Sequence, residues 1–199
     1  MGKIVVNMHM TLDGVIQAPG RPDEDMRNGF QYGGWAMPNN DEVMGRVMGK
    51  EMSQCAALLP GRITYEDFFG FWPKQKNNPY TEVLANIPKY VASNTLTQPL
   101  PWQNSTLLTG DVVEAVAKLK AQSEKDIAIL GSGALVQSLM HHNLIDKYVL
   151  MIHPLVLGAG RRLFQDGMPP SKFRLAESVA TTTGVIIAIY QSAVASLEF

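Results

Sequence analysis

The sequence predicts an α/β fold: a mostly parallel central sheet, extended by antiparallel strands, with helices on both faces. Two patterns support this prediction. In the first part of the chain, short apolar runs alternate with segments of helical periodicity, which is typical of parallel strands joined by crossover helices. From residue 148 onward, three strand-like runs follow one another without a helix, which is typical of an antiparallel extension. A chain of 199 residues can bury one substantial core, and we expect residues 1–199 to form a single domain.

The chain opens with a β-rich run at residues 3–9, and the sequence TLDG at residues 11–14 is typical of a turn. Residues 18–40 are rich in glycine, proline, asparagine and acidic residues. A loop of this length is uncommon in a compact domain and is often functional, so it is a candidate for a lid over a binding site.

A helix is expected after this loop, because Asn39 or Asn40 can serve as its N-cap and acidic residues follow in the first turn. Strands are then expected at residues 56–59, 88–93, 106–109 and 127–130, and helices after residue 61, at residues 111–119 and from residue 133 to about 143. Late strands are expected at residues 148–157, 173–181 and 185–192, with a hairpin turn at residues 181–184.

The most informative stretch reads IAILGSGALVQSL, from residue 127 to residue 139. Its glycines would let the backbone bend and approach a ligand, and the free N–H groups at a helix start attract anions. A turn that uses glycine only for its backbone conformation would give the same pattern, so the residues alone leave both readings open. A Rossmann site is disfavoured, because Val136 replaces the third glycine of that fingerprint and the motif lies late in the chain.

Two other strand ends carry groups of the same kind. Ligands of open α/β sheets bind beyond the carboxyl ends of the strands, so we expect these ends to meet. The candidates are Gly61, Arg62 and Thr64, then Ser93, Asn94 and Thr95, and then Gly131, Ser132 and Gly133. Together they predict an extended anion site with backbone donors, hydroxyl groups and one guanidinium, which suits a dinucleotide better than a single phosphate.

The composition excludes several classes of protein. The formal net charge is -1 and no block of like charge occurs, which argues against a nucleic-acid-binding protein. The single cysteine, Cys55, allows neither an intramolecular disulfide nor a cysteine metal site. The spacing of His141 and His142 suits no common zinc site, so no metal is expected. No apolar run is long enough for a signal peptide or a membrane span, and we expect a cytoplasmic protein with no membrane partner.

A family resemblance covers nearly the whole chain. It is carried by TLDGVI, LLPGRITYEDF followed by Trp72-Pro73, PKYVASNTL, IAILGSGALVQSL, LIDKYVLMIHPLVLGAGRRLF and the final hairpin. In this order, these motifs resemble the dihydrofolate reductase superfamily. The resemblance is closer to the branch related to the reductase domain of riboflavin biosynthesis, the bifunctional deaminase-reductase C-terminal domain. No deaminase zinc motif is present, so only the reductase part is expected.

The resemblance implies a dihydrofolate reductase-like domain that binds NADPH and passes a hydride to a small heterocyclic substrate, as 5-amino-6-(5-phosphoribosylamino)uracil reductase does. It implies that Gly61, Arg62 and Thr64 contact the cofactor phosphates and ribose, that Ser93, Asn94 and Thr95 hold the adenosine 2'-phosphate, and that Gly131, Ser132, Gly133, Ala134 and Leu135 lie beside the pyrophosphate. Many relatives carry arginine where this chain has Asn94. We therefore expect NADPH to be preferred over NADH by a narrower margin, with assistance from Lys89 if its side chain reaches the site.

The substrate side is less defined. Asp13 is the candidate catalytic and substrate-binding residue, because a carboxylate there could orient an amide-like edge or relay a proton; an ordinary Asp-Gly turn would place it equally well. Trp72 is expected to wall the substrate pocket, with Phe71 as a second candidate and core packing as the alternative role. The resemblance places Glu42 on the helix that carries the pterin-binding acid of dihydrofolate reductases. The helix dipole explains a glutamate in a first helical turn equally well. The arginines of residues 158–162 would meet either a substrate phosphate or solvent.

Two further expectations concern function and assembly. A non-catalytic nucleotide-binding module that retains the NADPH site is the alternative to a reductase. The expected partner is a small-molecule substrate, with no nucleic acid. A homodimer is expected, because residues 185–190 are apolar on both faces and relatives of this branch commonly pair.

Overall fold

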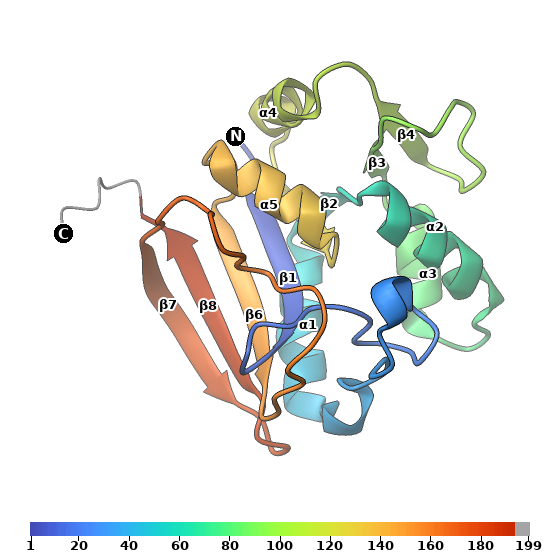
Figure 1. Ribbon diagram of the computed structural model, residues 1–199. Coiled ribbons are helices and arrows are strands. Elements are labelled where there is room, and N and C mark those ends of the chain that lie inside the picture. Colours follow the sequence, from blue (N-terminus) through green and yellow to red (C-terminus); the bar gives the residue numbers. More distant parts are fainter. Residues whose placement is uncertain (194–199) are drawn as a thin grey trace.

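One eight-stranded sheet runs through the molecule in the order β4-β3-β2-β5-β1-β6-β8-β7 (Figure 1). The structure is a computed structural model that describes residues 1–193, so the last six positions of the expected domain lie outside the described residues. The strands are β1 (Ile4–Thr11), β2 (Cys55–Leu58), β3 (Lys89–Ala92), β4 (Ser105–Leu108), β5 (Asp126–Leu130), β6 (Lys147–His153), β7 (Phe173–Ala180) and β8 (Ile186–Ser192).

The predicted mixed sheet is confirmed. Neighbouring strands are parallel from β4 to β6, whereas β8 is antiparallel to both β6 and β7. The predicted hairpin turn joins β7 to β8, and there the Thr181 hydroxyl accepts a hydrogen bond from the Val185 N–H at 3.0 Å. In Figure 1 these two strands form the edge of the sheet farthest from α2 and α3.

The helices are α1 (Glu42–Ser53), α2 (Arg62–Phe71), α3 (Pro79–Asn86), α4 (Val112–Gln122) and α5 (Gly133–His141). Single 3-10 turns occur at η1 (Arg27–Gly29), η2 (Met37–Asn39) and η3 (Trp72–Lys74). Asp41 caps α1 by accepting from the Met44 N–H at 2.8 Å, so the predicted caps Asn39 and Asn40 are wrong by one or two residues. Among the described residues, no helix is long and apolar enough to cross a membrane.

The helices cover both faces of the sheet and enclose three main apolar clusters. On one face, α4 and α5 pack on β1, β5 and β6. On the other face, Met44 of α1 packs against β6 and β8, while α2 and α3 pack against β2, β3 and β5. This arrangement leaves the carboxyl ends of the parallel strands without a helix directly above them.

The register of β1 opens the sheet at one point. On one side, β1 pairs with β5 only as far as Asn7, opposite Leu130, where β5 ends. On the other side, its pairing with β6 continues to Thr11, opposite His153. Beyond Asn7, therefore, one edge of β1 has no neighbouring strand, and the candidate site lies beside this edge.

Candidate active site

A cavity of about 1170 Å³ lies at the carboxyl ends of β2, β3 and β5, bounded by α1, α2, α5 and the loop at residues 16–41. It is lined by all eleven residues predicted for the cofactor: Gly61, Arg62, Thr64, Ser93, Asn94, Thr95, Gly131, Ser132, Gly133, Ala134 and Leu135. The structure thus brings the three predicted strand ends together, although they are far apart in the sequence.

Two helices begin at this cavity without a side-chain cap. Three helices have a side-chain cap: Asp41 caps α1, Asn78 caps α3 and Asp111 caps α4. The N-cap residues of α2 and α5 are Gly61 and Ser132, and neither makes such a bond. Free N–H groups and the positive end of the helix dipole favour an anion at such a terminus. Two uncapped termini beside one cavity fit a diphosphate, so these residues suit a dinucleotide cofactor.

A hydrogen bond ties the two termini together. The Ser132 hydroxyl accepts from the Gly61 N–H at 3.0 Å, which explains why it does not cap its own helix. Ser132 adopts a left-handed conformation with φ +55°, and Gly131 before it has φ +64°. The turn therefore presents successive N–H groups on its concave side, the arrangement known as an anion-binding nest.

Gly133 does not have a positive φ, and a side chain here would have to displace the flexible end of Ile16. A Cβ atom at this position would lie 2.4 Å from Cδ1 of Ile16, a side chain that also lines the cavity. The expectation that both glycines of the motif relax the backbone is thus correct only for Gly131.

The end of β3 forms a tight hydroxyl turn. The Ser93 hydroxyl accepts from the backbone N–H groups of Thr95 at 3.1 Å and Leu96 at 3.0 Å, and the Asn94 side chain is exposed at the cavity. Lys89 does not reach this site, contrary to the expected assistance. It is buried at the start of β3, with its ammonium group held by carbonyl groups at the end of α3, such as that of Leu84 at 2.7 Å.

Aromatic residues line the other end of the cavity, as predicted for Trp72. Its ring lies edge-on to Phe71, with 5.3 Å between ring centroids, and also packs near Phe68 and Tyr80. The remaining wall consists of methionines from α1, of which Met44 and Met48 line the cavity. Such soft, flat surroundings suit a planar ring.

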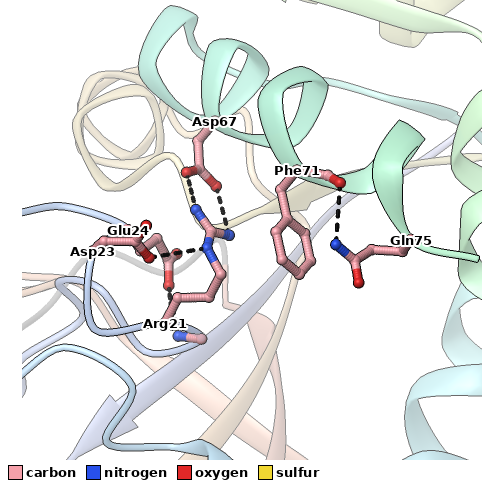
Figure 2. Close-up of polar contacts among 7 residues, drawn as sticks. Arg21, Asp23, Glu24, Asp67, Phe71 and Gln75 are labelled. Carbon is pink, nitrogen blue, oxygen red and sulfur yellow. Dashed lines mark hydrogen bonds and ion pairs between the residues drawn. The ribbon is translucent and has the colours of Figure 1, made fainter.

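The loop at residues 16–41 is fastened across the cavity. Arg21 forms an ion pair with Asp67 of α2, and its guanidinium carbon lies 4.3 Å from the ring centroid of Phe71 (Figure 2). The Glu24 carboxylate accepts from the backbone N–H groups of Gly20 at 2.6 Å and Arg21 at 3.1 Å, which fixes the conformation of the loop. The arrangement agrees with a covering loop.

Asp13 does not line the cavity. Its carboxylate accepts hydrogen bonds from the Thr11 hydroxyl at 2.6 Å, the Gly158 N–H at 2.9 Å and the Leu157 N–H at 3.2 Å, and the Thr11 bond contributes most to lowering its pKa to about 2. It also pairs with Arg162 at 3.5 Å. This carboxylate thus joins two loops, and its catalytic and substrate-binding role stays a prediction.

Three polar side chains of the site were not predicted. Asn7 and His9 lie on the same face of β1, and both line the cavity. His9 Nδ1 lies 2.9 Å from Nε2 of His153, whose Nδ1 lies 3.3 Å from the amide nitrogen of Asn39. Burial lowers the pKa of His9 to about 3 and that of His153 to about 4. The polar Asn7 and His9 within a largely apolar central strand were the available signal in the sequence.

The fold and the cavity define a dihydrofolate reductase-like α/β domain with one large cavity at the carboxyl edge of its sheet. The chain belongs to the RibD C-terminal domain family, whose model matches residues 2–187.

Individual relatives agree with this family. The protein YyaP of Bacillus subtilis (strain 168), which is uncharacterized, is 28% identical and is aligned over 94% of both chains. A pyrimidine reductase-like protein from Corynebacterium diphtheriae has a TM-score of 0.66 at 13% identity, covering 96% of this chain and 92% of that one. Dihydrofolate reductase from Enterococcus faecalis, complexed with NADP(H), has a TM-score of 0.59 at 13% identity, with 96% of each chain covered. The relationships support a reductase-type function.

Proposed function

We propose that this protein is an NADPH-dependent reductase of a small, neutral heterocycle of the pyrimidine type. The observation that carries the proposal is the convergence of three strand ends, with all eleven predicted cofactor residues, on one cavity. The family and the pyrimidine reductase-like neighbour support the substrate class, and the dihydrofolate reductase complexed with NADP(H) supports the cofactor.

The residues have distinct roles in this proposal. The uncapped starts of α2 and α5 hold the diphosphate of the cofactor, and the turn at residues 93–95 receives the adenosine 2'-phosphate. When bound, NADPH supplies a hydride from its nicotinamide ring. The open edge of β1 beyond Asn7 offers backbone groups to this ring, and the aromatic end around Trp72 holds the substrate.

Reduction also requires a proton, and in this proposal we assign its source to water. Five carboxylates line the cavity, and each already accepts hydrogen bonds within the protein: Glu24, Asp25, Asp41, Asp67 and Asp111. Hydrogen bonds, first among them that from the Met44 N–H, lower the pKa of Asp41. Burial raises the pKa of Glu24, but its carboxylate is held by the backbone N–H groups of Gly20 and Arg21.

The same observation favours a second candidate, a nucleotide-binding module without turnover. Such a protein would keep the NADPH site and would not need a proton donor. The two candidates agree on the cofactor and differ only in whether bound NADPH is oxidised.

Titration of the purified protein with NADPH, followed by nicotinamide fluorescence, tests the cofactor site. Loss of nicotinamide absorbance in the presence of pyrimidinone, pterin and quinone substrates then tests turnover. Binding with oxidation by a pyrimidinone supports the reductase. Binding without oxidation by any substrate supports the module, and absence of NADPH binding contradicts both.

A further inference from the structure

We propose that Asn7 and His9 bind the carbonyl–NH–carbonyl edge of a cyclic imide, such as a pyrimidinedione, and that Asn39 and His153 position His9 as a neutral hydrogen-bond donor. This inference rests on the proposed function, and it deepens it by naming the ring edge that the site accepts. It also distinguishes the site from one that recognises a protonated ring through a carboxylate.

The strand register brings three of the four side chains together, and Asn39 joins them from the turn η2. His9 of β1 is opposite Met151 of β6, and His153 follows two residues later on the same face of β6. The two imidazole rings have centroids 5.1 Å apart. The ring of Trp35 packs edge-on against His153, also at 5.1 Å, and leaves Asn39 as the polar neighbour of its outer nitrogen.

The order of partners determines the tautomer of each ring. The amide nitrogen of Asn39 can only donate, so Nδ1 of His153 accepts. His153 then carries its proton on Nε2 and donates it to Nδ1 of His9, at 2.9 Å. His9 in turn carries its proton on Nε2, the nitrogen that is left for a ligand.

His153 is fully buried, and His9 is exposed only in part, on the face that lines the cavity. Burial disfavours the charged form of both rings and lowers the pKa of each far below neutrality. At physiological pH, His9 is therefore a neutral N–H donor and not an acid. A donor of this kind selects a carbonyl oxygen.

Asn7 provides an independent indication of a ligand. Only 3% of this residue is exposed, and neither its amide oxygen nor its amide nitrogen has a hydrogen-bond partner within the described part of the chain. A buried amide without partners is costly to the fold. Because Asn7 lines the cavity two residues before His9, a bound ring edge can satisfy it.

The two side chains offer a complementary set of groups. His9 supplies one donor, and the Asn7 amide supplies one acceptor and a second donor. An imide edge presents the matching acceptor, donor and acceptor. A 2,4-diaminopyrimidine, in which amino groups replace the carbonyl oxygens, would place donors against the donors of the protein.

The first experiment measures tautomers without any ligand. Long-range ¹H–¹⁵N NMR spectra distinguish Nδ1–H from Nε2–H imidazoles, and the chain has only four histidines to assign. We expect the Nε2–H form at both His9 and His153 in the wild type, and a mixture of tautomers in Asn39→Leu. An Nδ1–H form at His9 in the wild type would overturn the proposal.

The second experiment measures binding by calorimetry, with 5,6-diaminouracil and 2,4-diaminopyrimidine as probes. We expect the wild type to prefer the uracil, and His9→Leu and Asn7→Leu each to weaken it by roughly tenfold or more. His9→Gln, which restores an N–H donor, should recover part of the affinity, and His142→Leu on the exposed surface should have no effect. Asn7→Leu should also raise the urea midpoint of unfolding, because it removes the unpaired amide.

The two proposals fail in different ways. If NADPH does not bind but the uracil preference and its dependence on residues 7 and 9 hold, the imide site stands and the reductase does not. If NADPH binds and is oxidised but uracil affinity is unchanged in Asn7→Leu and His9→Leu, the imide site is wrong. Equal affinity for the two probes, or no binding of the uracil, also overturns it.

Discussion

At Asp13, three hydrogen bonds and an ion pair meet on one carboxylate that is 18% exposed. Asp13→Asn should therefore reduce stability by about 1–2 kcal/mol at pH 7 and leave turnover nearly unchanged. The folded-state pKa of about 2 lies below the usual value, so this stabilisation is present above about pH 4 and is lost as pH falls toward 2.

The measurement is urea unfolding of Asp13→Asn and wild type between pH 2.5 and 7. The stability difference should be constant at the upper end and shrink at the lower end. Asp166→Asn, which removes the same charge at an exposed position, is the control. A large loss of turnover in a stable Asp13→Asn protein would support the catalytic role.

Gly133→Val should weaken NADPH binding by roughly tenfold or more, with the fold retained. The added side chain would collide with Ile16, and displacement of Ile16 narrows the cavity beside the start of α5. Fluorescence titration measures the effect. Gly49→Val in α1, where a Cβ meets nothing within 4 Å, is the matched control, and native affinity in Gly133→Val would remove the role assigned to this turn.

Asn94→Arg should widen the preference for NADPH over NADH by about tenfold, because a guanidinium adds a charge-assisted contact to the 2'-phosphate. The measurement is the ratio of the two Kd values at fixed ionic strength, since such contacts weaken with salt. Thr97→Arg adds the same charge at an exposed position that does not line the cavity. An unchanged ratio in Asn94→Arg would show that residue 94 does not face the 2'-phosphate.

At the level of elements, an ion pair attaches the covering loop to α2. Arg21→Met keeps an apolar stem but removes the ion pair with Asp67 and the cation over Phe71 (Figure 2). We expect faster hydrogen exchange of amides at residues 18–36, measured by mass spectrometry, because the loop loses its attachment to α2.

The control for this prediction is Arg27→Met. Arg27 pairs with Asp25 inside the loop, so its loss should not release the loop from α2. Asp67→Asn should reproduce the effect of Arg21→Met, and the double variant should add little. Unchanged exchange in both single variants would mean that other contacts hold the loop.

The sequence predicted most elements, and the meeting of three strand ends at one cavity, because each of their signals is local. At each of the three strand ends, the glycines and hydroxyls lie within a few residues of one another. The Asp111 cap of α4 is likewise predicted directly from Asp111 and Glu114. Helix α3 was missed, although Asn78 followed by Pro79 is a recognisable helix start.

The substrate half could not be predicted in the same way. His9 and His153 are separated by 144 positions, and Arg21 and Asp67 by 46. Their contacts depend on strand register and on the path of a long loop, neither of which leaves a pattern in the sequence. The same holds for most partners of the Asp13 carboxylate, which come from residues 157–162, and the role expected for Asp13 stays a prediction.

At the scale of the whole molecule, a homodimer remains a prediction, but its physical basis changes. The apolar core of β8 is covered within the chain, with Ile187 and Ile189 buried against α1. The exposed edge is β7 instead, where Leu175 is 50% exposed. Ile186 of β8, which is 43% exposed, lies at the other end of this strand pair, opposite Ala180. Unpaired edges with exposed apolar residues favour pairing with another chain.

Light scattering at micromolar concentration should therefore report twice the chain mass of 21.9 kDa. Leu175→Lys should shift the protein toward the monomer, because a charge on an edge strand opposes pairing. The control is Glu114→Lys, which changes charge on the distant helix α4. Lys172→Leu is not suitable, because it adds apolar surface to the same edge as Leu175. A wild type found only at 21.9 kDa would contradict the prediction.

The central position of β1 in the sheet has a consequence for how the chain folds during synthesis. Val5 precedes both of its neighbouring strands in the chain, because β5 starts at Asp126 and Val5 pairs on its other side with Lys147. During synthesis, the apolar residues of this strand therefore have no neighbouring strand to pair with until most of the chain has been made. Contacts this distant in sequence are slow to form, and an unpaired apolar strand is a target for aggregation. We expect folding to begin elsewhere, with β1 inserting late between β5 and β6, and a chain that stops before Lys147 to depend on chaperones for its solubility.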